Sequence, residues 1–208
     1  MRTCAIVPVK RLLHSKARLA PSMNPGERRD LTLKMLRHVL SELTGWIGQA
    51  IVVGSDEEVR KVAESSGALF ELDQASSLNS AVTQAISRCM AEGFDSVLVI
   101  AADLPLLSCH ELKNMLNNTA DESIVICPSK DCGTNALLLR PPRSIPVRFG
   151  SRSLTGHLNE TMRSGRRFKL YWSLGLTFDL DTAADLQMLR KTGFLACQNP
   201  SSWTRRRC

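Results

Sequence analysis

The sequence predicts an α/β sandwich with a mostly parallel β-sheet. Short apolar runs alternate along the chain with longer segments whose apolar residues recur at helical spacing, and no repeat or low-complexity linker interrupts them. The chain has 208 residues, of which 43% are hydrophobic and 23% charged, so it can bury a substantial core. We expect one domain over 1–195, followed by a basic, flexible tail over 196–208.

The first strand is expected over 3–9, an apolar run that ends at a basic loop. A helix follows, because Asn24 can cap it, Pro25 suits its first position and Glu27 can reach back to the cap. One face of this helix should pack on the sheet, since its apolar residues recur at helical spacing. These residues are Leu31, Met35, Leu36, Val39, Leu40 and Leu43.

Four further strands are expected, over 50–56, 67–72, 95–101 and 123–129. Capping signals mark the helices between them. Ser55 and Glu58 have the spacing of a capping box, and so do Ser108 and Glu111. Asn79 is expected to cap the helix that runs to about residue 90.

After residue 129 the alternation changes. A turn and an apolar strand are expected over 131–140, a turn into a helix over 148–158, and another strand over 168–173. The last helix should begin near Thr182. Its expected inward residues are Leu186, Met188 and Leu189.

Unusual polar residues follow several of the predicted strands. In an open α/β sheet, ligands bind beyond the carboxyl ends of the strands, so neighbouring loops form one binding site. We therefore expect one crevice to be shared by the loops that follow Val9, Ser55, Ala102 and Ser129.

The loop after the first strand is basic, with Lys10, Lys16 and Arg18. Such a loop can neutralise a triphosphate, because arginine grips two phosphate oxygens at once and lysine acts as a point charge. A solvated basic loop explains the same residues, since no GxxxxGK[ST] phosphate cradle accompanies them. Spacing alone leaves both interpretations open.

Asp103 ends an apolar strand, where an unpaired charge is costly. It either begins a turn before Pro105 or binds Mg²⁺, which prefers carboxylate oxygens. Asp179 and Asp181 would project to the same side of an extended segment, which makes Asp181 a second candidate ligand. Asp185 can instead cap the last helix.

Two segments could bind an anion. Thr134 and Asn135 follow a turn whose backbone amides could hold a phosphate or carboxylate, although a plain hairpin turn explains it equally. Gly150 and Ser153 precede a helix whose unpaired amides favour an anion, although Ser153 could simply cap that helix. His157 is more typical of a structural or solvent-facing residue than of a catalyst.

Composition excludes several classes of protein. The net charge of +7 suits anionic partners, but it is common among proteins that bind nothing acidic. Seven scattered cysteines show no zinc-ligand spacing, and neither a catalytic triad nor a GxGxxG signature occurs. Neither a secretory leader nor an apolar stretch long enough to span a bilayer is apparent, so we expect a cytoplasmic protein without a membrane partner.

Seven motifs together resemble the guanylyltransferases of coenzyme F420 biosynthesis, known as phospholactate or phosphoenolpyruvate guanylyltransferases. They occur in order over about the first 190 residues: "VPVK" from Val7, "SKARL" from Ser15, "LN" from Leu78, "AADLPLL" from Ala101, "DCGTNALLLRPP" from Asp131, "RFGSRSL" from Arg148 and "FDLDTAADL" from Phe178. The combination is more specific than any one motif.

The resemblance implies a doubly wound, three-layer sandwich like that of the nucleotide-diphospho-sugar transferases. It implies transfer of GMP from GTP to a small phosphorylated carboxylic acid, with release of pyrophosphate. The acceptor stays open between 2-phospho-L-lactate, phosphoenolpyruvate and 3-phosphoglycerate. The partners implied are these two substrates, with no nucleic acid, and the oligomeric state, including a homodimer, stays open.

The resemblance also implies roles for individual residues. Asp103 and Asp181 would bind Mg²⁺, and Asp103, Lys16 and Arg18 would form the catalytic group. The residues implied to hold GTP are Lys10, Lys16, Arg18, Leu78 and Asn79. Those implied to hold the acceptor are Thr134, Asn135, Gly150 and Ser153. Two residues depart from the family's usual pattern: Cys132, where a second glycine is usual, and Ala17, where a polar residue is common.

Two other functions would account for part of the sequence. Another nucleotidyltransferase of the same fold, of the molybdenum-cofactor or sugar-phosphate type, would usually have a glycine-rich first loop, which "VPVKRLLHSKARL" replaces. A basic nucleic-acid-binding protein would draw on the net charge and the C-terminal arginines. Against it, aromatic residues make up only 5% of the chain and no recognition module is apparent.

Overall fold

The computed structural model of the chain describes residues 2–44, 46–75 and 77–191. The boundary expected at residue 195 and the tail expected beyond it lie outside these residues. The strands are β1 Thr3–Pro8, β2 Gln49–Gly54, β3 Leu69–Leu72, β4 Ser96–Ile100, β5 Ile124–Pro128, β6 Thr134–Leu139 and β7 Phe168–Leu170. The α-helices are α1 Pro25–Leu43, α2 Glu57–Ser65, α3 Leu78–Ala91, α4 Cys109–Asn118, α5 Ser153–Ser164, α6 Leu174–Thr177 and α7 Ala183–Lys191, and two 3₁₀ turns are η1 Leu12–His14 and η2 Ala17–Leu19.

The strands form one sheet in the order β3-β2-β1-β4-β6-β5-β7. β1 pairs in parallel with β2 and β4, and the pairs β2–β3 and β5–β7 are also parallel. Only β6 is antiparallel to its neighbours, β4 and β5, because the short turn after β5 reverses the chain. The predicted mostly parallel sheet is confirmed.

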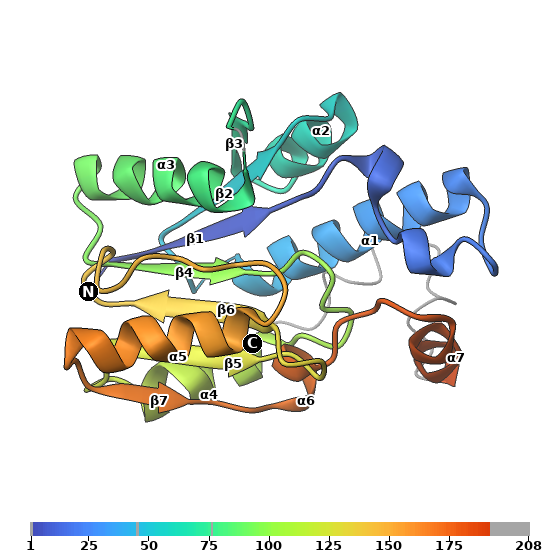
Figure 1. Cartoon of the computed structure of the whole chain (residues 1–208). Coiled ribbons are helices and arrows are strands. Elements are labelled where there is room, and N and C mark those ends of the chain that lie inside the picture. The colour runs from blue at the N-terminus through green and yellow to red at the C-terminus, as the bar shows by residue number, and fades with distance from the viewer. Residues whose placement is uncertain (1, 45, 76, 192–208) are drawn as a thin grey trace.

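Helices cover both faces of this sheet, as Figure 1 shows. Alternate strand residues face opposite sides, so Ala5 and Val7 pack with α1, α2 and α4, whereas Cys4 and Ile6 pack with α3. Burial on both faces explains why the strands read as continuous apolar runs rather than alternating ones. In the described part of the chain, no helix has the length and apolar character needed to cross a membrane.

Two of the predicted helix starts are confirmed. Asn24 accepts a hydrogen bond from the Glu27 N–H at 3.0 Å and donates its own N–H to the Glu27 carboxylate, which completes a capping box. Ser108 and Glu111 form the same box at the start of α4.

Two other predicted caps are wrong. Asp56, not Ser55, precedes α2, and its carboxylate accepts the Leu12 N–H at 3.1 Å instead of capping the helix. Ser77 caps α3, and Asn79 lies inside that helix. In both cases a residue within two positions of the predicted cap has the backbone geometry of the cap.

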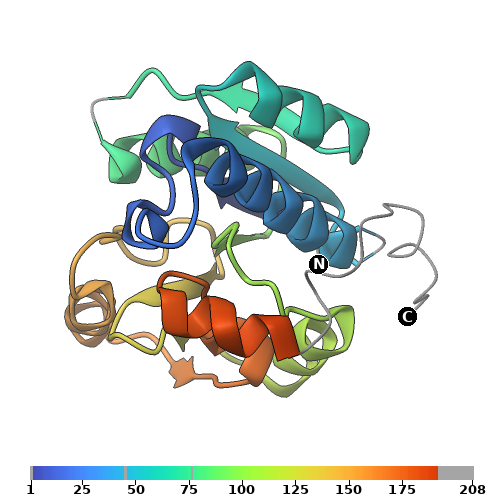
Figure 2. The same ribbon diagram turned by 90° about the vertical axis from the view of Figure 1, so that its right-hand side faces the viewer.

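The C-terminal part of the described chain packs against the N-terminal loop. Leu186 and Leu189 of α7 share an apolar cluster with Leu19 of η2 and with Leu31 and Met35 of α1. Figure 2 shows α7 at the same end of the molecule as η2 and the start of α1. Met188, which we expected to face inward, is 48% exposed. This packing brings residues near position 180 beside the loop after β1.

Candidate active site

A crevice of about 840 Å³ lies beyond the carboxyl ends of β1 and β4. The loops after Val9, Ala102 and Ser129 line it together, as the sequence predicted. Among the residues that the structure describes, the loop after Ser55 contributes none to the lining, so that part of the prediction is wrong. Instead, the segment before α5 and the residues Asp179 and Asp181 complete the lining.

Lys16 is at the centre of the charged part of the crevice. Its backbone is left-handed, with φ 51° and ψ 38°, at the residue before η2. Its ammonium donates hydrogen bonds to the carboxylates of Asp103 and Asp181, the latter at 2.8 Å. The side chain of Lys16 is only 6% exposed, so two carboxylates from distant parts of the chain share one buried cation.

Lys16, Asp103 and Asp181 stabilise one another in their charged forms. Burial alone would lower the pKa of Lys16, but Asp103 and Asp181 outweigh it and raise that pKa. Burial likewise opposes ionisation of Asp181, but the Lys16 ammonium lowers its pKa. The cost of placing Asp103 at the end of a core strand is therefore offset by a neighbouring cation.

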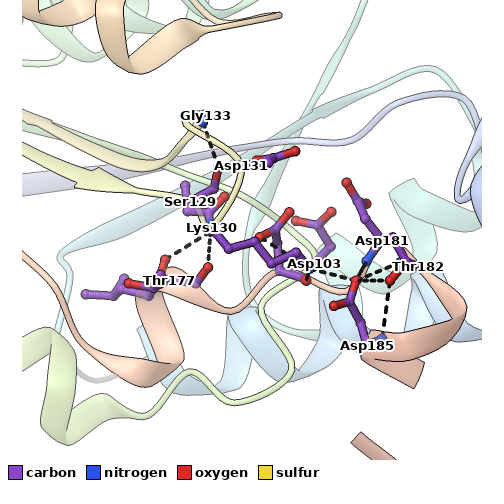
Figure 3. A network of polar contacts seen from close by, with 12 residues as sticks. Asp103, Ser129, Lys130, Asp131, Gly133, Thr177, Asp181, Thr182 and Asp185 are labelled. Atoms are coloured by element: carbon purple, nitrogen blue, oxygen red, sulfur yellow. Dashed lines mark hydrogen bonds and ion pairs between the residues drawn. The ribbon is translucent and has the colours of Figure 1, made fainter. Parts of the chain in front are cut away.

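Lys130, which the sequence analysis did not single out, braces the segment that carries Asp181. Its ammonium donates to the Asp179 carbonyl oxygen at 2.6 Å and pairs with the Asp185 carboxylate at 2.6 Å. Figure 3 shows Lys130 extending from the turn of Ser129 and Asp131 toward Asp185. No pattern in the sequence marks this lysine, because its partners lie about 50 residues away.

Asp185 holds the start of α7, as the sequence allowed. Its carboxylate accepts the N–H groups of Asp181 at 3.0 Å and Thr182 at 2.7 Å. Burial opposes its ionisation, but Lys130 and these donors lower the pKa of Asp185 to about 2. The backbone of Asp181 is thereby fixed relative to Lys130.

Asp179 has a different environment from Asp181. Its residue is 6% exposed, and its Oδ1 lies 4.0 Å from the Lys130 ammonium and makes no hydrogen bond with the described residues. Burial raises the pKa of Asp179, against the opposing effect of Lys130. Asp179 and Asp181 thus both line the crevice but contact different lysines.

The turn between β5 and β6 is a hairpin. The Ser129 N–H donates to the Gly133 carbonyl at 3.1 Å, and the Ser129 hydroxyl accepts the Gly133 N–H at 2.8 Å. A Cβ at position 133 would lie 2.6 Å from the Ser129 hydroxyl, so a side chain there would displace this hydroxyl from its hydrogen bonds to Gly133 and Asp131. Cys132, which departs from the family pattern, adopts a left-handed backbone with φ 63°. That conformation explains why glycine suits this position.

The four residues predicted to bind an acceptor, Thr134, Asn135, Gly150 and Ser153, all line the crevice. The Asn135 amide donates to the carbonyls of Leu176 at 3.1 Å and Thr177 at 3.2 Å, so its nitrogen is already engaged. α5 begins at Ser153 after a left-handed Arg152, and no side chain caps it. The simpler explanation of Ser153, as a plain cap, is therefore wrong.

Most of the residues predicted to hold a nucleotide line the crevice. Lys10, Arg18 and Leu78 line the crevice with Lys16, but Asn79 does not. The Asn79 carboxamide accepts the Phe149 N–H at 2.7 Å and donates to the Phe149 carbonyl at 3.0 Å. Asn79 therefore holds Phe149, which itself lines the crevice.

Comparison with known proteins identifies the family. Residues 3–193 match the family described as CofC-like guanylyl transferases. The chain belongs to this family. It is 37% identical over 187 residues to a 2-phospho-L-lactate guanylyltransferase of Methanothermobacter thermautotrophicus. The aligned region makes up 89% of this chain and 83% of that protein. It is also 36% identical over 192 residues to a phosphoenolpyruvate guanylyltransferase of Sphaerobacter thermophilus. That aligned region makes up 91% of this chain and 93% of that protein.

Solved structures confirm the fold of this guanylyltransferase. A Desulfovibrio desulfuricans protein described as a nucleotide-diphospho-sugar transferase superposes with a TM-score of 0.77 at 19% identity, covering 98% of this chain and 93% of that one. A nucleotidyl transferase of Methanothermobacter superposes with a TM-score of 0.70 at 17% identity, covering 94% and 98%. The three-layer sandwich expected from the resemblance is thus confirmed.

The charged end of the guanylyltransferase crevice suits a hard divalent cation. The carboxylates of Asp103 and Asp181 both contact the Lys16 ammonium, so both can reach a single cation. Over the described ranges, no group of three or more histidine, cysteine or acidic residues could hold a metal by itself. Two carboxylates fit Mg²⁺, because that ion usually keeps water and substrate phosphate oxygens as its other ligands.

Proposed function

We propose that the chain transfers GMP from GTP to a small phosphorylated carboxylic acid and releases pyrophosphate, as a step of coenzyme F420 biosynthesis. The observation that carries this proposal is the meeting of Asp103 and Asp181 around the Lys16 ammonium, in a crevice that Gly150 and Ser153 at the start of α5 also line. The relatives named as phospholactate and phosphoenolpyruvate guanylyltransferases support the substrate class. The acceptor is 2-phospho-L-lactate, phosphoenolpyruvate or 3-phosphoglycerate.

In this proposal, cations of the loop after β1 bind the triphosphate. Lys10 and Arg18 line the crevice on either side of Lys16 in the sequence. Arginine can grip two phosphate oxygens, and the lysines add point charges. Leu78 contributes to the wall near the nucleoside, while Asn79 acts from outside the crevice by holding Phe149.

Asp103 and Asp181 would hold Mg²⁺, which when bound neutralises charge on the phosphoryl oxygens. Lys130 and Asp185 keep Asp181 oriented, so this carboxylate needs little rearrangement to act as a ligand. To contact a phosphate of GTP, the Lys16 ammonium would give up a hydrogen bond to Asp103 or Asp181.

The acceptor would lie against Thr134, Asn135, Gly150 and Ser153. Gly150 has φ 131°, a conformation that favours glycine, and it leads into the start of α5, where no side chain caps the helix and the Leu154 N–H donates to the Cys132 carbonyl at 3.3 Å. An acceptor phosphate is already ionised at neutral pH, so the protein needs no strong general base. Its residues contribute by holding the two substrates in line and by neutralising charge.

We also propose that this is a cytoplasmic enzyme whose partners are its two small substrates, rather than a nucleic acid or a membrane. The direct test is pyrophosphate release from GTP and from ATP with each of the three acceptors, followed by mass spectrometry of the product. We expect release with GTP, Mg²⁺ and at least one acceptor, and a product heavier than that acceptor by a GMP group. No release with any acceptor, or equal release from ATP, contradicts the proposal.

A further inference from the structure

His157 lies in the first half of α5 and is fully buried, yet both of its ring nitrogens are hydrogen-bonded. Nε2 lies 2.9 Å from the backbone nitrogen of Arg148, which donates to it. Nδ1 lies 3.0 Å from the hydroxyl oxygen of Thr134. The histidine thus joins the start of β6 to the segment that leads into α5.

These contacts determine which ring nitrogen carries the proton. A backbone N–H can only donate, so Nε2 must accept and carries no hydrogen. A neutral imidazole has one N–H, which is therefore on Nδ1 and donates to the Thr134 oxygen. The ring is neutral near pH 7, because burial and the charge of Arg148 lower the pKa of His157 to about 4, against the smaller opposing effect of Glu160.

The proton on Nδ1 restricts what Thr134 can do. A hydroxyl has one hydrogen and two lone pairs, and Thr134 uses a lone pair to accept from His157. Its own hydrogen cannot be donated to the ring. Because Thr134 lines the crevice, that hydrogen is left for a group that accepts hydrogen bonds there.

We propose that His157 is a positioning residue that presents the Thr134 hydroxyl as a hydrogen-bond donor to the anionic end of the acceptor. The inference rests on the proposed function, which places Thr134 beside that acceptor. Hydrogen bonds to a charged group are among the stronger ones, so fixing a donor favours a phosphate or carboxylate over a neutral group.

Packing holds the ring of His157 in this orientation. Phe149 contacts it edge to face, with ring centroids 4.9 Å apart and planes at 72°. Phe149 is in turn held at both its N–H and its carbonyl by Asn79. The orientation of Thr134 therefore depends on a chain of contacts that begins on α3.

Two substitutions test the roles of the two ring nitrogens of His157 separately. The amide of His157→Asn can take the place of Nδ1 and donate to Thr134, whereas the amide of His157→Gln can take the place of Nε2 and accept from Arg148. We expect His157→Gln and Thr134→Val each to raise the acceptor KM about tenfold, with the GTP KM unchanged. His157→Asn should keep an acceptor KM close to that of the wild type.

The double variant of Thr134→Val and His157→Gln should be no worse than either single variant, because both remove the same donor. Additive effects would contradict the inference. The opposite order, with His157→Gln active and His157→Asn impaired, would show that His157 only holds the Arg148 backbone. If Thr134→Val itself leaves the acceptor KM unchanged, the proposed acceptor site is wrong as well.

The protonated nitrogen can be measured without turnover, by ¹⁵N NMR of the wild-type protein at pH 7. His38 is the internal control, since it is also buried and burial lowers its pKa to about 4, against the opposing effect of the Leu107 carbonyl. Its Nε2 contacts that carbonyl oxygen at 2.9 Å, which can only accept, so His38 should carry its proton on Nε2. We expect the opposite tautomer for His157, and a proton on its Nε2 would overturn the inference.

Discussion

Replacing Lys16 with methionine tests the charge balance of the crevice most directly. The substitution leaves Asp103 and Asp181 facing each other without their shared cation, while an apolar side chain of similar length fills the same space. Breaking a buried ion pair costs about 3–5 kcal/mol, and an exposed pair is worth about 0–1 kcal/mol. The two carboxylates are 29% and 31% exposed, so we expect an intermediate loss of about 1–3 kcal/mol.

For a chain of this size, that loss corresponds to a melting temperature lower by roughly 2–12 °C. Mg²⁺ should restore more stability to Lys16→Met than to the wild type, because it can take the place of the missing ammonium. The assay is thermal unfolding followed by circular dichroism, with Mg²⁺ and with a chelator. Lys169→Met is the matched control, since Lys169 is exposed and donates to the Asn118 carbonyl away from the crevice.

Two results would refute this reasoning. If Lys16→Met melts at the wild-type temperature without Mg²⁺, the ammonium does not hold the two carboxylates together. If Mg²⁺ shifts both proteins equally, the ion does not bind where Lys16 lies.

Three further predictions follow from the site and its pKa values. Asp103→Asn should lower kcat at least about 100-fold while unfolding stays cooperative, because it removes half of the proposed metal site; unchanged pyrophosphate release would contradict this role. Ser153→Ala should raise the acceptor KM about tenfold and leave the GTP KM unaltered, and substrate titrations with both ligands would reveal the reverse. The free energy of unfolding should decrease as pH falls from about 6.5 to about 4, because His157 and His38 are held neutral in the folded state and take up protons more readily when unfolded. Urea titrations across that range measure the decrease, and His157→Asn should remove its share of the slope.

Local signals predicted the elements well where no distant residue intervenes. Asn24 with Glu27, and Ser108 with Glu111, form capping boxes because each pair lies within one turn of its own helix. The prediction for Asn79 failed because Ser77, two residues earlier, has the backbone geometry of the cap, and the Asn79 amide is engaged by Phe149, 70 residues away.

The same distinction separates the parts of the candidate site. Apolar periodicity and strand-end polarity, which are local, determined the mostly parallel sheet and placed Asp103, Lys16 and Thr134 at its ligand-binding edge. The motifs together determined the family. Each motif and each periodic pattern involves residues close in sequence, and the order of the motifs is given by the sequence itself, so they can be read without knowing how the chain folds.

Only the tertiary structure decided which charges meet. Lys16 contacts Asp181 across 165 positions of the sequence, because α7 packs on η2 and α1. The brace formed by Lys130 and the proton position on His157 likewise depend on contacts between distant segments. Such contacts arise from the packing of whole elements, and no local pattern of residue types specifies them.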